Sequence, residues 1–287
     1  MIRFPFHLFA GSSDFPIHMQ YGSHQEDDCY LHGHEDFSEL VIVLCGEAHH
    51  IVGGDSYPIS KGDVFVINQF TEHSFVHADQ LEICNFMFKP ELVFANSYDM
   101  KKLPGFQALF ILEPHCSQNY HFCSQLKLTA GEFTDAQQRV TDMMNEYTKK
   151  EPGWKDYIFS SFCLFCMLLS RCYNTENVSP DHAFLKLADA VAYMENNYSD
   201  AISTETLAGI AGYSERQFLR LFKSVFATTP NLYIVNLRMK KAQQLLKAAD
   251  ATIGEIAWNC GYDDQNYFSR VFKKHTGMTP SEYQRIL

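Results

Sequence analysis

The sequence lacks an apolar run long enough to cross a membrane. Its longest run, Tyr157–Leu169, contains Ser160 and Ser161 and ends before Arg171. Since a transmembrane helix needs about 20 consecutive apolar residues, this run predicts a buried helix. The first ten residues carry a single arginine and an apolar stretch interrupted by proline and histidine. We therefore expect neither a signal peptide nor a membrane partner.

The cysteines are not arranged for a disulfide scaffold or a zinc site. There are nine, an odd number, and several lie inside apolar runs. Small secreted disulfide scaffolds carry paired cysteines in a short chain. Cys163 and Cys166 have CxxC spacing, but their stretch is apolar and no second pair stands at zinc spacing. We expect buried free thiols and a reducing, cytoplasmic compartment.

Basic residues are scarce for a nucleic-acid-binding protein, because 23 Lys+Arg face 34 Asp+Glu, a net charge of −11. The distribution is uneven. From residue 182 onward there are 12 basic and 10 acidic residues, a net charge of +2, whereas residues 1–181 carry −13. The last third of the chain is therefore locally basic and compatible with nucleic acid. A length of 287 residues suggests two domains.

Residues 30–90 carry short apolar segments separated by turn signals. Leu40–Leu44 and Val64–Asn68 are β-branched and short, as strands are. Turns are expected at Cys45–Glu47, Gly53–Asp55 and Lys61–Asp63. Many short strands joined by tight turns favour a small β-barrel or jelly roll.

After about residue 130 the pattern is helical. Thr134 is the predicted N-cap of a helix that runs to Lys150. One face of this helix carries the apolar stripe Val140, Met143, Met144 and Tyr147. The stripe fits core packing, and it equally fits pairing with the same helix of a second subunit.

A polar segment divides the chain. Residues 154–173 form a second expected helix, and residues 174–180 are polar, without periodicity, and end in proline. The predicted organisation is an α+β multidomain protein. Its parts are a β-barrel domain with helices at its end (residues 1–173), a linker (174–180) and an all-helical domain (181–287).

One segment occurs twice within the helical domain, about 50 residues apart. The matching pairs are Leu207–Ser214 with Ile256–Asp263, Phe218–Lys223 with Phe268–Lys273, and Thr229–Pro230 with Thr279–Pro280. Each copy fits a helix, a glycine-containing turn and a second helix, the usual DNA-binding helix-turn-helix. A long helix, Asn231–Lys247, is expected between them. The repeat predicts two major-groove contacts on one duplex.

The second helix of each copy carries an apolar inner face and a polar outer face. Arginine can pair with guanine, glutamine and asparagine with adenine, and lysine with phosphate. Any one of these residues alone fits a solvated helix surface, but matching positions in both copies favour DNA contact. Ser214 is expected to cap the first helix, and Asp263 or Asp264 the second. The candidate DNA-binding residues are Ser214, Arg216, Gln217, Arg220, Lys223, Gln265, Asn266, Ser269, Arg270, Lys273 and Lys274.

The second copy resembles the signature of the AraC/XylS family of transcription regulators. The matching residues are Ile256-Ala257-x3-Gly261-Tyr262-x4-Tyr267-Phe268-Ser269-Arg270-x-Phe272-Lys273-Lys274-x2-Gly277-x-Thr279-Pro280-x2-Tyr283. The resemblance covers about 100 residues. It implies that the long helix holds both recognition helices in successive major grooves, on one face of the DNA. The base contacts that it implies are Arg216, Gln217, Arg220, Gln265, Asn266 and Arg270. The first copy departs from the family at Ala227, where glycine is usual, and at Leu219, where a polar residue is common.

The front domain carries the spacing of the first cupin motif, HxHx4Ex6G, at His32, His34, Glu39 and Gly46. The second motif is partial. Gly62 and His73 are correctly spaced, whereas Asn68 and Phe70 replace the usual proline and glycine, and His77 replaces the usual asparagine. The barrel is therefore expected to be cupin-like.

His32, His34, Glu39 and His73 can converge, because alternate residues of a strand share one face. Three interpretations stay open: polar residues with a structural role, the lining of an effector pocket, or ligands of a transition metal such as iron, manganese, nickel or zinc. We expect no cofactor. If a metal is bound, we expect these four residues to be its ligands.

Together these patterns predict a DNA-binding transcription regulator, not an enzyme. The resemblance implies an activator that forms a homodimer, binds double-stranded DNA in the major groove and recruits RNA polymerase. A small molecule in the barrel is expected to control it. The layout resembles arabinose- and rhamnose-responsive regulators, so a sugar is the expected effector. The alternative is a metal-dependent cupin enzyme fused to a DNA-binding domain. An RNA-binding protein is disfavoured, since the repeat offers no aromatic stacking platform.

Overall fold

The computed structural model describes residues 2–10, 15–24, 30–69, 71–95, 97–116, 126–173, 186–248 and 251–285. The chain forms two compact units, Met1–Ala188 and Asp189–Leu287. The predicted linker, residues 174–180, lies outside the described residues. The α+β class is confirmed, because a mixed sheet and several helices build the first unit and helices alone build the second.

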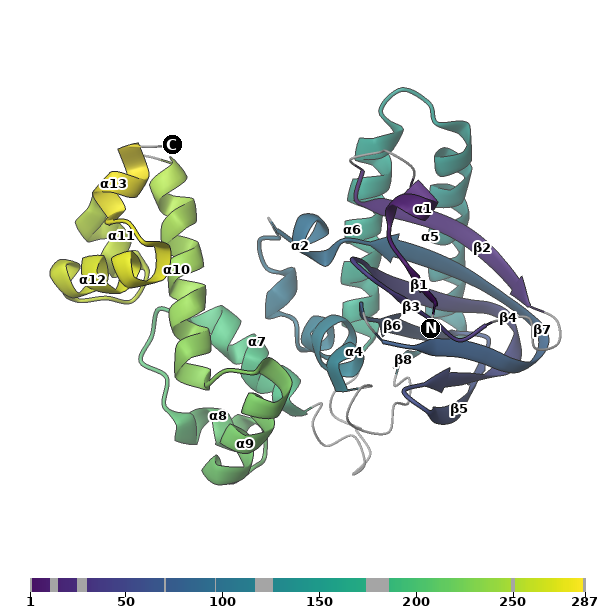
Figure 1. Ribbon diagram of the computed structural model, residues 1–287, viewed down its shortest axis with the longest axis horizontal. Coiled ribbons are helices and arrows are strands. Elements are labelled where there is room, and N and C mark those ends of the chain that lie inside the picture. Colours follow the sequence, from purple (N-terminus) through teal and green to yellow (C-terminus); the bar gives the residue numbers. More distant parts are fainter. Residues whose placement is uncertain are drawn as a thin grey trace. The chain divides into compact units, whose positions relative to one another are not determined.

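Eight strands form the sheet of the first unit (Figure 1). Their bounds are β1 Ile2–Phe4, β2 Ile17–His24, β3 His32–His34, β4 Ser38–Val52, β5 Asp55–Ser60, β6 Asp63–Ile67, β7 His73–Phe88 and β8 Leu126–Lys127. Strands β4 and β7 pair antiparallel along nearly their whole length. The first half of β4 also pairs with β6, its second half with β5, and β7 also pairs with β2 and β3. The long β4–β7 pair is therefore the centre of the sheet, and β2, β3, β5 and β6 pair directly with it.

The turn predicted at Cys45–Glu47 is wrong, because β4 continues through it. The register with β7 shifts at three places between Val43 and His49, which marks a bulged, bending strand. Gly46 has a φ of +73°, and a Cβ there would overlap the carbonyl oxygen of Gln80. Gly46, which looks like a turn residue in the sequence, therefore lies at a bulge where β4 bends and continues.

Helices complete the first unit. They are α1 His7–Ala10, α2 Pro90–Val93, η1 Met100–Lys102, α3 Pro104–Phe106, the π-helix η2 Gln107–Leu112, α4 Glu113–Cys116, α5 Ala130–Lys149 and α6 Trp154–Cys172. Helices α5 and α6 run antiparallel beside the sheet (Figure 1). Phe162 of α6 stacks on Phe86 of β7, with ring centroids 5.3 Å apart. The stripe residues Val140 and Met143 are each 1% exposed, so they pack into the core of their own unit.

The predicted cap at Thr134 is wrong. Helix α5 begins one turn earlier, where the Thr129 side chain accepts a hydrogen bond from the Glu132 amide and Glu132 accepts one from the Thr129 amide. The Thr134 hydroxyl instead donates to the carbonyl oxygen of Ala130 inside the helix. The earlier start buries Phe133 in the core.

In the second unit, the described residues form helices and the turns between them. They are α7 Leu187–Asn197, α8 Thr204–Ile210, α9 Glu215–Phe226, α10 Pro230–Ala248, α11 Ile253–Asn259, α12 Gln265–Thr276 and α13 Pro280–Arg285. The pairs α8–α9 and α11–α12 are the two predicted helix-turn-helix motifs, and α10 is the long helix between them (Figure 1). Among the described helices, none has the length and apolar character needed to cross a membrane.

Candidate functional site

Helix α9 presents its polar residues to solvent and its aromatic residues to the core. Phe218 and Phe222 are fully buried. Arg216, Arg220 and Lys223 are exposed, as the sequence predicts. The apolar face therefore fixes the helix on its own motif and leaves three cations free to meet a DNA groove.

A capping box begins α9. The Ser214 hydroxyl accepts from the Gln217 amide, and the Gln217 side-chain oxygen accepts from the Ser214 hydroxyl (2.8 Å) and the Ser214 amide (3.3 Å). Ser214 is therefore the N-cap of α9, as the sequence predicts. Adenine recognition by glutamine uses both the oxygen and the amino group of its side chain. The base contact of Gln217 stays a prediction, and it requires this cap to open.

The N-terminus of helix α12 is capped by the side chain of one residue. Asp264 is its N-cap and accepts from the amides of Asn266 (2.6 Å) and Tyr267 (2.8 Å). The side chain of Tyr267, the counterpart of Gln217, is consequently outside the cap. Arg270 lies over its ring, with the guanidinium carbon 5.7 Å from the ring centroid. Such a contact orients an arginine, and sequence reasoning missed this role of Tyr267.

The other candidates on α12 are exposed as predicted, except Ser269. Gln265, Asn266, Lys273 and Lys274 are exposed. Ser269 is half-buried, and its hydroxyl donates to the carbonyl oxygen of Gln265 (2.8 Å). Both recognition helices therefore carry an exposed polar face over a buried pair of phenylalanines, Phe268 and Phe272 in α12.

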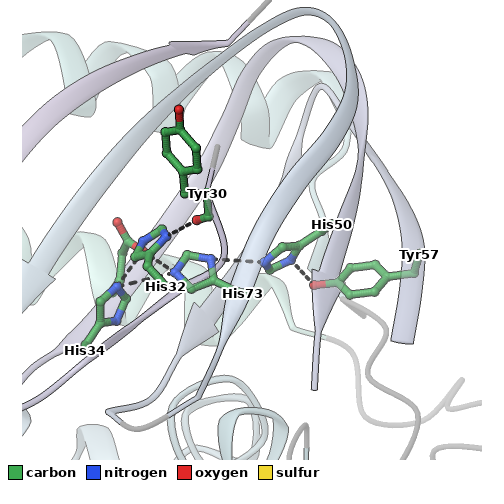
Figure 2. A network of polar contacts seen from close by, with 7 residues as sticks. Tyr30, His32, His34, His50, Tyr57 and His73 are labelled. Carbon is green, nitrogen blue, oxygen red and sulfur yellow. Dashed lines mark hydrogen bonds and ion pairs between the residues drawn. The ribbon is translucent and has the colours of Figure 1, made fainter. Parts of the chain in front are cut away.

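The first unit contains a cluster of imidazoles and one carboxyl group. His32 and His34 lie on β3, Glu39 on β4 and His73 at the start of β7. The strand register aligns His32 with His73. Figure 2 shows how the imidazoles of His32, His34 and His73 face one another. The four residues singled out by the cupin motif are thus brought together.

Distances within this cluster are short but not those of good hydrogen bonds. The Nε2 atoms of His34 and His73 are 3.4 Å apart, and each lies 3.5 Å from Oε2 of Glu39. Ring nitrogens of His32, His34 and His73 all lie within 4.8 Å of one another. Oε2 of Glu39 and Nδ1 of His34 have no hydrogen-bond partner of normal geometry. A buried cluster with unsatisfied polar atoms is the kind of site that a ligand completes.

Burial keeps the cluster uncharged. It lowers the pKa of His34 to about 3, with a further contribution from neighbouring His32, and it raises the pKa of Glu39 to about 8. It also holds the pKa of His73 well below its usual value. Near neutral pH the imidazoles therefore offer lone pairs and the carboxyl group is largely protonated.

Sequence reasoning missed an extension of the cluster. Nε2 of His50 lies 3.4 Å from Nδ1 of His73, and Nδ1 of His50 is hydrogen-bonded to the Tyr57 hydroxyl (Figure 2). The His50 ring packs against Phe65 and Phe75, at centroid distances of 4.6 and 4.8 Å. Its position follows from β4 pairing with β5 and β7 at this residue, a register that motif spacing does not reveal.

A cavity of about 540 Å³ lies beside the cluster. It is lined by Phe4, Leu8, Phe9, Gln20, Tyr21, Gly22, Ser23, His24, His32, His34, Glu39, His73, Phe75, Asn85 and Met87. The side-chain oxygen of Asn85 has no hydrogen-bond partner. The cavity thus combines apolar walls with a few unsatisfied polar atoms, as small-molecule sites do.

The donor set also fits a metal ion. Three imidazoles and one carboxylate suit iron, manganese, nickel or zinc. Burying a charged Glu39 carboxylate without a partner is unfavourable, and a bound cation would compensate this cost by direct attraction. Among the described residues, His32, His34 and His73 are the only group of three such side chains close enough to share an ion.

Comparison with known proteins gives matches in both units. A family model described as a helix-turn-helix domain matches residues 207–286, and a cupin domain model matches residues 18–87. The HTH-type transcriptional activator RhaS of Enterobacter sp. (strain 638) is 28% identical over 252 residues, covering 88% of this chain and 86% of that protein. The HTH-type transcriptional activator RhaR of Escherichia coli (strain K12) is 28% identical over 260 residues, covering 90% and 88%.

A solved structure from Chromobacterium violaceum, described as a transcriptional regulator with an AraC-type DNA-binding domain, is 37% identical. The match covers 35% of this chain and 89% of that chain, with a TM-score of 0.33.

Proposed function

Because this chain belongs to the AraC/XylS family of DNA-binding transcription regulators and carries a cupin domain, we propose that a small molecule in the barrel controls its binding to DNA. Both recognition helices contact one duplex. Effector binding changes DNA binding only if one arrangement of the two units binds the effector better than the other.

The matched exposed faces of α9 and α12 support contact with DNA by both motifs. Arg220 and Arg270 stand at equivalent positions and are both exposed. We expect Arg220→Ala or Arg270→Ala to weaken binding by about 1–3 kcal/mol and to relax the preference at one base position each. Binding-site selection followed by titration measures both effects.

The matched control is Lys247→Ala, which removes an exposed cation from α10, outside the recognition helices. It should leave the base preferences unchanged. An equal loss on every sequence for an arginine variant would assign that arginine to phosphate contact instead.

The cavity beside the imidazole cluster supports a polar organic effector. Oε2 of Glu39, Nδ1 of His34 and Oδ1 of Asn85 are the unsatisfied atoms around it. A sugar or related polyol carries several hydroxyl groups that can donate to and accept from such atoms, while its C–H faces pack on the phenylalanine side chains. We propose this class as the effector.

A bound metal ion is the second candidate for the same site, favoured by the convergence of three imidazoles with the Glu39 carboxyl group beside two of them. His32, His34, His73 and Glu39 would hold the ion. It would supply a Lewis-acid centre to which effector oxygens bind. The relatives are transcription regulators, so a metal in this chain serves ligand recognition rather than an enzyme reaction in this proposal.

A thermal-shift series separates the two candidates. Sugars and divalent metals are added singly to protein treated with chelator, and a ligand at 100 times its Kd adds about 2.7 kcal/mol of stability. Glu39→Gln should abolish the response to the metal. His49→Ala removes an exposed imidazole from the same strand and is the control. A response to neither class contradicts both proposals.

We also propose that the protein is a homodimer that recruits RNA polymerase as an activator in the cytoplasm. RhaS and RhaR, which match most of the chain, are named activators. Free thiols support a reducing compartment: Cys84, Cys166 and Cys260 are buried as expected, whereas Cys163 is half-buried and Cys45 is exposed. Tyr157 and Leu164, two turns apart on α6, are 46% and 52% exposed and offer an apolar face for the second subunit.

A further inference from the structure

A single arginine of α10 bonds to the segment that precedes the first helix-turn-helix motif and to the turn of the second. Nε of Arg238 donates to the carbonyl oxygen of Tyr198 (2.6 Å), and Nη2 donates to that of Asp200 (3.0 Å). Both acceptors lie in the segment that leads into α8 of the first motif. Nη1 donates to the carbonyl oxygen of Gly261 (2.9 Å), in the turn between α11 and α12 of the second motif. The guanidinium also lies over the Tyr262 ring, 5.2 Å from its centroid.

The two bonded segments are in direct backbone contact. Gly261 has a φ of +77°, and a Cβ at this position would overlap the carbonyl oxygen of Ser199. Nη2 of Arg238 lies 3.5 Å from the same oxygen. Glycine is therefore required here for two reasons, its backbone conformation and the close approach.

These contacts give the motifs a second connection besides the length of α10. Helix α10 packs on the two motifs over different parts of its length, since Tyr233 lies against Phe222 and Phe226 of the first motif. Met239, Ala242 and Leu246 share a buried core with α11 and α12 of the second. Bending of α10 between these two parts would change the angle between the motifs. Charge-assisted hydrogen bonds are stronger than neutral ones, and the planar guanidinium fixes the directions of its donors. Arg238 thus ties three points of the unit together.

We propose that Arg238 is a positioning residue that sets the distance and angle between α9 and α12, and through them the base-pair spacing that the protein accepts between its two half-sites. The inference rests on the proposed function, in which both recognition helices contact one duplex. Each inserted base pair moves the second half-site by about 3.4 Å along the duplex and about 35° around it. A rigid pair of helices cannot follow this displacement, whereas a loosened pair can.

The test uses the full chain and a DNA site selected from random sequence with the unaltered protein. Affinity is measured for this site and for the same site with one base pair inserted between its halves. The unaltered protein should lose about tenfold or more on insertion. Arg238→Lys and Arg238→Ala should bind the original site several-fold more weakly, and should lose less than about threefold on insertion.

The matched control is Lys240→Ala, which removes an exposed cation two residues away on the same helix. It should keep the full insertion penalty. A merely structural role of Arg238 lowers the amount of folded protein, which circular dichroism detects, but does not change the ratio between the two sites. Folded Arg238 variants with an unaltered insertion penalty would overturn the inference.

Two further outcomes are distinguishable. If Arg220→Ala and Arg270→Ala leave DNA binding of the otherwise unaltered protein intact, the proposed contact of both helices fails, whatever Arg238 does. If both Arg238 variants fail to fold, Gly261→Ala replaces them in the test. Its added Cβ would overlap the carbonyl oxygen of Ser199 and so push apart the two segments that Arg238 joins. An unaltered insertion penalty in folded Gly261→Ala then counts against the inference.

Discussion

Each recognition helix ends in a left-handed residue, but the two residues differ. Ala227 follows α9 with a φ of +51°, and Gly277 follows α12 with a φ of +83°. This conformation costs an L-residue about 1–2 kcal/mol, whereas glycine adopts it freely. The departure from the family pattern noted in the sequence is therefore a local strain at one helix end.

Exchanging these residues gives opposite effects. We expect Ala227→Gly to raise the free energy of unfolding of the second unit by about 0.5–1 kcal/mol, part of the relief being offset by the greater freedom of glycine in the unfolded chain. Gly277→Ala should lower it by a similar amount, because no atom within 4 Å opposes the added Cβ and only the backbone conformation matters. Urea denaturation measures both changes. Destabilisation by Ala227→Gly would show that the strain is absent.

At the scale of elements, helices bounded by local signals were predicted well. The helix expected at Asn231–Lys247 is observed at Pro230–Ala248, since periodicity and caps depend on neighbours in sequence. Thr129 and Thr134 show the limit of such signals. Each is followed three residues later by Glu or Gln, so both fit a capping box, and burial of Phe133 favours the earlier one.

Strands depend on distant partners, and there the sequence was less informative. Glycine at position 46 looks like a turn locally, yet pairing with β7 carries β4 through it. The same holds in the barrel site. A spaced motif predicted His32, His34, Glu39 and His73, whereas His50 and Tyr57 join them only through the register of β4, β5 and β7. Arg238 was missed because its partners are backbone carbonyls far along the chain.

At the scale of the whole molecule, each unit has its own core. Phe162 belongs to the first and Phe268 to the second, and both are fully buried. We expect Phe162→Ala and Phe268→Ala each to cost about 3–5 kcal/mol of stability in their own unit. Calorimetry should show two unfolding transitions, each lowered by one substitution only. A single transition lowered by both would mean that the units unfold together.

The two N-caps have a consequence for anyone who wishes to retarget this protein to new DNA. In α9 the cap occupies both Ser214 and Gln217, so randomising position 217 to change base preference also disturbs the start of the helix. In α12 Asp264 caps alone, and position 267 can be varied at no cost to the helix start. Libraries built on the second motif therefore have one more usable position than libraries built on the first. Varying position 267 also changes the ring over which the Arg270 guanidinium lies.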